Sequence, residues 1–88
     1  MPEVKIVVNH KVGLHARPAA VFVKAANKFT SDIQVTKEDR TINAKSILSV
    51  LTLGVNQGTE ITINAEGEDA DAALQELVAL IEDNFGEE

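Results

Sequence analysis

The chain has 88 residues, no cysteine and a formal net charge of −6 at pH 7. This length suits one domain, residues 1–88, with a single thin core, and the lack of cysteine excludes disulfides, thiolate catalysis and cysteine-ligated zinc or iron–sulfur sites. The acidic balance argues against a general nucleic-acid binder. No apolar run approaches the roughly 20 residues that span a bilayer, so we expect no membrane insertion and a cytoplasmic location.

The charges are divided unevenly along the chain. All eight Lys and Arg residues lie within residues 1–45, together with four acidic residues, whereas residues 46–88 hold ten acidic residues and no basic one. The acidic tail is typical of a surface that serves solubility. The basic half is the better candidate for a functional, positively charged face.

The first half of the chain predicts a strand, a helix and two further strands. β-branched residues around one polar Lys5 predict a strand over 4–8. Apolar residues at three- and four-residue spacing predict an amphipathic helix from Ala16 to Phe29, with Pro18 in the first turn, where a missing N–H costs nothing. The other predicted elements of this half are a strand over 32–37, a turn over 38–40 and a strand over 41–44.

The second half predicts a short helix, a strand and a long helix. Ser46 is placed to cap the short helix and Gly54 to end it, and its apolar residues cover more than one face, so at least one should stay exposed. A strand is predicted over 60–66, and Asp69 is placed to cap a helix whose apolar stripe reaches Phe85. The order β-α-β-β-α-β-α predicts an α/β two-layer sandwich, an antiparallel sheet with helices on one face.

Two histidines are the candidate nucleophiles or proton carriers near neutral pH. His10 lies at the end of a predicted strand, where we expect a solvated surface side chain. His15 stands where a loop becomes a helix, and a first helical turn offers unpaired N–H groups and partial positive charge to an anion such as phosphate. Arg17 adds a guanidinium that can bind phosphate oxygens with paired hydrogen bonds.

The chemistry that suits His15 is phosphoryl transfer. A neutral imidazole is a nucleophile toward phosphorus, and positive surroundings should keep the ring neutral at pH 7 and neutralise a transferring phosphoryl group. From the residues alone, a histidine in this position is more commonly a helix cap or a surface residue beside Arg17. The structural role and the phosphoryl-acceptor role of His15 therefore both stay open. Two histidines without a carboxylate cluster do not predict a metal site. No cofactor is expected, and no residue set indicates a hydrolase.

Residues 13–19, Gly-Leu-His-Ala-Arg-Pro-Ala, resemble the active-site signature of the HPr family, the histidine-containing phosphocarriers of the bacterial phosphoenolpyruvate-dependent sugar phosphotransferase system. Residues 43–54 resemble the regulatory serine segment of that family, and residues 57–63 and 65–70 also match its patterns. The resemblance covers the whole chain. It implies an open-faced sandwich with a four-stranded antiparallel sheet in the order 1-4-2-3 and three helices on one face.

The resemblance also implies a role for each matching residue. His15 would receive a phosphoryl group on Nδ1 from phosphorylated Enzyme I and donate it to a histidine of an enzyme IIA component, as a carrier and not as an enzyme. Arg17 and the N–H groups of Ala16 and Arg17 would hold the phosphate. The residues implied to meet partners are Ile47, Leu48 and Leu51, of which Leu48 is expected to be exposed, with a positive rim of Lys24, Lys28 and Lys45.

Ser46 is a second candidate site. In the Gram-positive branch of the family, a dedicated kinase/phosphorylase modifies the matching serine and promotes binding to a catabolite-control transcription regulator. Ser49 stands where that branch commonly has glycine, and Leu48 and Leu51 where it often has methionine, so this regulation stays open. A nitrogen-branch paralogue and a mainly regulatory, Ser46-dependent binding module are alternatives, although regulatory-only relatives lack His15. We expect a monomer.

Overall fold

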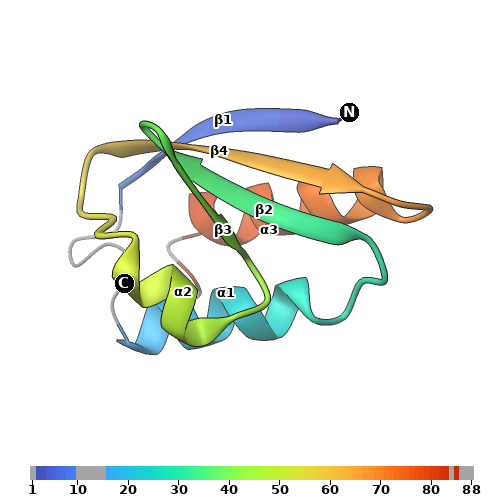
Figure 1. The fold of residues 1–88 in the computed structure, drawn as a ribbon, viewed down its shortest axis with the longest axis horizontal. Coiled ribbons are helices and arrows are strands. Elements are labelled where there is room, and N and C mark those ends of the chain that lie inside the picture. The colour runs from blue at the N-terminus through green and yellow to red at the C-terminus, as the bar shows by residue number, and fades with distance from the viewer. Residues whose placement is uncertain (1, 10–15, 84, 86–88) are drawn as a thin grey trace.

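The structure, a computed structural model, describes residues 2–9, 16–83 and 85. Its elements follow the order β-α-β-β-α-β-α that the sequence predicts (Figure 1). Their bounds are β1 Glu3–Val8, α1 Ala16–Ala26, β2 Asp32–Lys37, β3 Arg40–Asn43, α2 Ile47–Thr52, β4 Thr59–Glu66 and α3 Ala70–Glu82.

The four strands form one antiparallel sheet in the order β1-β4-β2-β3, as expected. The long strand β4 lies in the middle, where Ile63 pairs with Val4 of β1 on one side and with Val35 of β2 on the other. All three helices lie on the same side of the sheet (Figure 1). The predicted two-layer sandwich is therefore confirmed, and the other face of the sheet is left without helices.

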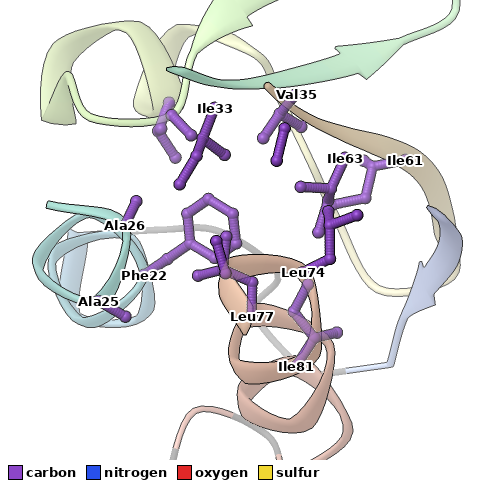
Figure 2. Close-up of a cluster of buried hydrophobic side chains, with 14 of the residues drawn as sticks. Phe22, Ala25, Ala26, Ile33, Val35, Ile61, Ile63, Leu74, Leu77 and Ile81 are labelled. Carbon is purple, nitrogen blue, oxygen red and sulfur yellow. The ribbon is translucent and has the colours of Figure 1, made fainter. Parts of the chain in front are cut away.

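The hydrophobic core fills the space between the sheet and the helices. Phe22 of α1 points between α3 and the strands, where it meets Leu77 of α3 and Ile33 of β2 (Figure 2). Phe22 and Leu77 are fully buried and Ile33 is 1% exposed. Burying one such side chain stabilises the fold by about 1.5–3 kcal/mol, so this cluster is what holds the helices against the sheet.

Several element ends differ from the predictions by one to three residues; β1 and β4 each begin one residue early, at Glu3 and Thr59, and β3 ends at Asn43. Helix α1 stops at Ala26 instead of Phe29, because the N–H groups of Lys28 and Phe29 bond to carbonyls three residues back, at 3.1 and 3.3 Å, in tight turns. Phe29 still packs against the core from that turn. Strand β3 begins at Arg40, which pairs with Lys37, so the turn has two residues and not three.

The C-terminal helix differs in the same way. Helix α3 ends at Glu82, and Phe85 lies beyond it with a φ of 58°, yet Phe85 is only 3% exposed. A turn therefore places Phe85 in the core, where a continued helix was predicted. Helical spacing shows that a residue faces the core but does not show which backbone conformation carries it there.

Asp69 occupies the N-cap position of α3, as predicted, and its carbonyl accepts from the Ala73 N–H at 2.9 Å, but its side chain does not cap the helix. The Asp69 carboxylate makes no capping bond to α3 and instead accepts hydrogen bonds from the backbone N–H groups of Thr30 and Ser31, both at 2.9 Å, and from the Ser31 hydroxyl. These bonds lower the pKa of Asp69 from 3.8 to about 2, and the bond from the Ser31 hydroxyl contributes most. The carboxylate has these donors because the loop before β2 lies against the start of α3.

The same contact requires glycine at residue 67. Gly67 has a φ of 145°, and a Cβ added there would lie 2.8 Å from the Cα of Ser31. The backbone of the β4–α3 turn thus approaches the Ser31 backbone more closely than any side chain allows. Gly67 and Asp69 together join the end of the sheet to the start of α3.

Candidate functional site

The predicted phosphoryl site lies at the start of α1, which the structure places at Ala16. His15 directly precedes this residue and, like His10, lies outside the described residues. The side chain of Arg17 is exposed, whereas Pro18 is buried at the third helical position. The first turn of α1 holds no acidic residue, so no carboxylate in that turn offsets the partial positive charge of the helix N-terminus.

Helix α2 lies beside α1 (Figure 1), and it presents apolar side chains to solvent. Leu48 is 73% exposed, Leu51 39% and Ile47 36%, whereas Val50 is 1% exposed and belongs to the core. The expectation that Leu48 is exposed is confirmed, and Ile47 and Leu51 are not core residues. We call Ile47, Leu48 and Leu51 the α2 apolar face. Neighbouring exposed apolar side chains of this kind are typical of protein-binding surfaces.

Ser46 caps the N-terminus of α2, as the sequence predicts. Its backbone is extended, with φ −110° and ψ 114°, and its Oγ accepts a hydrogen bond from the Ser49 N–H at 3.3 Å. The Ser46 carbonyl accepts from the Val50 N–H at 3.0 Å. Ser46 thus lies at the positive end of the α2 dipole, next to Ile47 of the α2 apolar face.

The three lysines of the expected positive rim differ in their contacts. Lys24 is exposed in the last turn of α1. Lys28 forms an ion pair with Glu76 of α3, and Lys45 donates its ammonium to the Phe29 carbonyl at 2.7 Å while half-buried. Two of these lysines therefore make polar contacts with other parts of the chain in addition to carrying positive charge.

Two cations that the sequence does not indicate as functional bind the C-terminal end of α2. Arg40 donates from Nη1 to the Thr52 carbonyl at 2.8 Å, and Lys37 donates from Nζ to the Gly54 carbonyl at 2.9 Å. These partners lie 12 and 17 residues apart in the chain. No local spacing indicates such contacts, because they arise only when the β2–β3 hairpin folds over the helix layer.

Within residues 2–9, 16–83 and 85, no group of three or more His, Cys, Asp or Glu side chains could hold a metal ion. No helix in these ranges is both long and apolar enough to cross a membrane. The expectations about cofactors and metals involve His10 and His15, which lie outside these ranges, and they stay predictions.

Comparison with known proteins identifies the family. The family model described as the PTS HPr component phosphorylation site matches residues 2–83. The chain belongs to the HPr family. This HPr-family chain is 47% identical to the HPr-like protein Crh of Bacillus subtilis over 83 residues, which cover 94% of this chain and 98% of Crh. It is 48% identical to the phosphocarrier protein HPr of Haemophilus influenzae over 79 residues, covering 90% and 91% of the two chains.

Solved structures of HPr proteins have the same fold. The crystal structure of HPr-C-His from Thermoanaerobacter tengcongensis matches with a TM-score of 0.97 at 52% identity, over 100% of this chain and 99% of that one. A crystal structure of an HPr dimer from the same organism matches with a TM-score of 0.80 at 52% identity, over 99% and 100%. This HPr-family chain is thus a member of the phosphocarrier family of the phosphotransferase system. Its monomeric state stays a prediction.

Proposed function

We propose that this chain is a phosphoryl carrier of the sugar phosphotransferase system, acting in the cytoplasm as a single domain of residues 1–88 and as a monomer. Nδ1 of His15 attacks the phosphoryl group of phosphorylated Enzyme I. A nitrogen–phosphorus bond forms on His15 as the bond to Enzyme I breaks, and a histidine of an enzyme IIA component then takes the group. The observation that carries this proposal is the family match over residues 2–83, joined to a helix that begins directly after His15.

The start of α1 supplies the electrostatics that the transfer needs. The N–H groups of Ala16 and Arg17 lie in the first turn, where backbone donors point out of the helix end and can bind an anion. Together with the Arg17 guanidinium they stabilise the charge on the transferring group. The buried Pro18 fixes φ in this turn, and its packing holds the helix start against the core.

The α2 apolar face and Lys24 are the proposed docking residues. A carrier must bind Enzyme I and each IIA component and then release them, which favours a small patch over a large interface. Ile47, Leu48 and Leu51 supply the apolar contact. The basic residues within residues 1–45 attract acidic partner surfaces toward the site. Lys24 and Lys45 are the lysines that we propose for this role.

The test of the carrier role is labelling by phosphoenolpyruvate and Enzyme I. We expect one acid-labile, base-stable phosphate per chain, carried by His15. His15→Ala should take up none, and His10→Ala, the matched control for the loss of an imidazole, should label as the wild type does. Equal labelling of His15→Ala and the wild type would refute the proposal. A nitrogen-branch phosphodonor that labels the chain in place of Enzyme I would assign it to that branch.

We infer a second role, regulation through Ser46, from the cap geometry. A phosphate on Ser46 Oγ would lie at the helix end, close to the Ser49 N–H that Oγ binds now. It would bring up to two negative charges beside Ile47, which repel an acidic docking partner. An HPr kinase/phosphorylase would add this group, and a catabolite-control transcription regulator would bind the modified chain.

The regulatory role is tested with the kinase and labelled ATP. Ser46→Ala should take up no phosphate, and Ser49→Ala, which removes a hydroxyl one helical turn away, should still be modified. Phosphate on Ser46→Ala would show that the site is wrong. The wild-type chain with phosphate on Ser46 should also accept phosphoryl groups from Enzyme I more slowly than the unmodified chain.

A further inference from the structure

The helix that carries the α2 apolar face is too short to be stable by itself. Helix α2 has six residues, fewer than half of the roughly 12–15 that give even a marginal helix in water. Of its last carbonyl groups, that of Ser49 accepts from Thr52 Oγ1 at 2.7 Å and that of Val50 from the Leu53 N–H at 3.2 Å. A carbonyl at the very end of a helix has no partner within it, and the last turn of α2 contains no basic residue. The carbonyls that follow Val50 therefore depend on groups from elsewhere in the fold.

The β2–β3 hairpin supplies these groups. Lys37 and Arg40 pair across the hairpin, two residues beyond the pair Val35 and Ile42, whose side chains face the helix layer. Alternation along the strands places both cations on that same side, toward α2. Besides the bond of Arg40 to Thr52 at 2.8 Å and that of Lys37 to Gly54 at 2.9 Å, Lys37 also reaches the Leu53 carbonyl at 3.4 Å.

The arrangement binds the hairpin and the helix end to each other. Two like charges directly opposite each other are unfavourable in a sheet, and Lys37 and Arg40 occupy such positions. The carbonyls at the end of α2 carry the negative end of the helix dipole, which attracts both cations. The helix-end carbonyls thus offset the repulsion between Lys37 and Arg40, and the two cations stabilise the negative end of the helix dipole.

We propose that Lys37 and Arg40 are positioning residues for partner binding. They hold the C-terminal end of α2 and thereby keep the α2 apolar face in the geometry that Enzyme I binds. This inference rests on the proposed function, because it assigns Lys37 and Arg40 to the docking of the same partner. Neither cation acts on the phosphoryl group. Their loss should therefore weaken docking and leave the transfer step within the bound complex unchanged.

The experiment compares the wild type with Lys37→Met, Arg40→Met and the double variant. We expect faster amide hydrogen exchange in Val50 to Leu53 and a KM for Enzyme I that rises by about tenfold in the double variant, the scale of one lost charged hydrogen bond. The kcat should not change. Arg40→Lys, which keeps a donor and a charge, should recover part of the KM.

A control variant separates positioning from general electrostatic steering. Lys5→Met removes the same charge from the exposed side chain of β1, far from the bonds to α2. It should leave α2 exchange unchanged and alter KM much less than Arg40→Met, which also removes one charge. An equal change in KM for Lys5→Met and Arg40→Met would mean that only net charge matters, and it would overturn the inference.

Two further outcomes distinguish this inference from the proposed function. Unchanged amide exchange in the double variant would show that the cations do not hold α2, even if His15 carries phosphate normally. Failure of the wild-type chain to accept phosphate from Enzyme I would refute the carrier proposal, and with it the docking role of Lys37 and Arg40. Faster exchange in the double variant would then still show that they cap α2.

Discussion

Helices α2 and α3 show two ways in which a helix is held in this fold. Helix α3 has 13 residues and buries five of them, Ala70, Ala73, Leu74, Leu77 and Ile81, whereas α2 has six residues and buries only Val50. The longer helix is held by what it buries. The shorter one exposes its apolar side chains and is held by hydrogen bonds at its two ends. Most apolar residues of α3 therefore stabilise the fold, whereas those of α2 other than Val50 are available to a partner.

The largest expected effect is on stability when a leucine is shortened in each helix. Leu77→Ala removes a fully buried side chain of α3 and should lower the free energy of unfolding by about 2–5 kcal/mol. Leu48→Ala, the matched change in α2 at a side chain 73% exposed, should change it by less than about 0.5 kcal/mol. Urea unfolding measures both. Equal losses would contradict the distinction between the two helices.

The turn that begins α3 should be the next most sensitive position. Gly67→Ala places a Cβ 2.8 Å from the Cα of Ser31 at a φ of 145° and should cost about 1–3 kcal/mol of unfolding free energy. Gly58→Ala is the control, since Gly58 also has a positive φ, 88°, but has no atom within 4 Å of an added Cβ. Its loss should be smaller, on the order of 1 kcal/mol. Similar losses in thermal or urea unfolding would show that the close approach to Ser31 does not matter.

A smaller change in free energy is expected for the binding of Enzyme I. Leu48→Ala should raise the KM for Enzyme I by roughly tenfold, equivalent to about 1.4 kcal/mol, the scale of a residue near the centre of an interface. Steady-state phosphotransfer at varied carrier concentration measures it. The control is Val7→Ala, at an apolar side chain 41% exposed on β1, which should leave KM unchanged. An unaltered KM for Leu48→Ala would remove Leu48 from the docking face.

The smallest expected effect is a loss of folding stability at acid pH, caused by one carboxylate. The pKa of Asp69 is lowered to about 2, so its ionised form contributes full stability above the ordinary value of 3.8, and that contribution is lost as pH falls from 3.8 to about 2. Asp69→Asn lacks it at every pH. The difference in unfolding free energy between wild type and Asp69→Asn should therefore be constant near neutrality and shrink in that acid range.

Urea unfolding over a series of pH values measures this difference, and Asp71→Asn in the first turn of α3 is the control. Asp71→Asn should not reproduce the pH dependence, because the hydrogen bonds from Thr30 and Ser31 go to Asp69. A difference between wild type and Asp69→Asn that does not vary between pH 3.8 and 2 would show that these bonds do not favour the charged carboxylate.

Much of the fold could be predicted because its apolar spacing is regular. The period of two in β2 and β4 and the period of 3.6 in α1 and α3 indicate the elements and their inner faces. The surplus of apolar residues in α2 also indicates an exposed face, and the exposure of Leu48 confirms it. The positions of Phe29 and Phe85 could not be predicted, because a buried aromatic can be carried by a turn as well as by a helix.

The sequence by itself determined the order of the elements, the burial of their apolar faces and the resemblance that points to His15, since each depends on residues close together in the chain. Only the tertiary structure decided the partners of Asp69, Lys37 and Arg40. Asp69 binds residues 38 and 39 positions away, and the cations bind carbonyls 12 to 17 positions away. Such pairs are set by how the hairpin and helices pack, because a charged side chain bonds to whichever backbone groups the folded chain brings within reach.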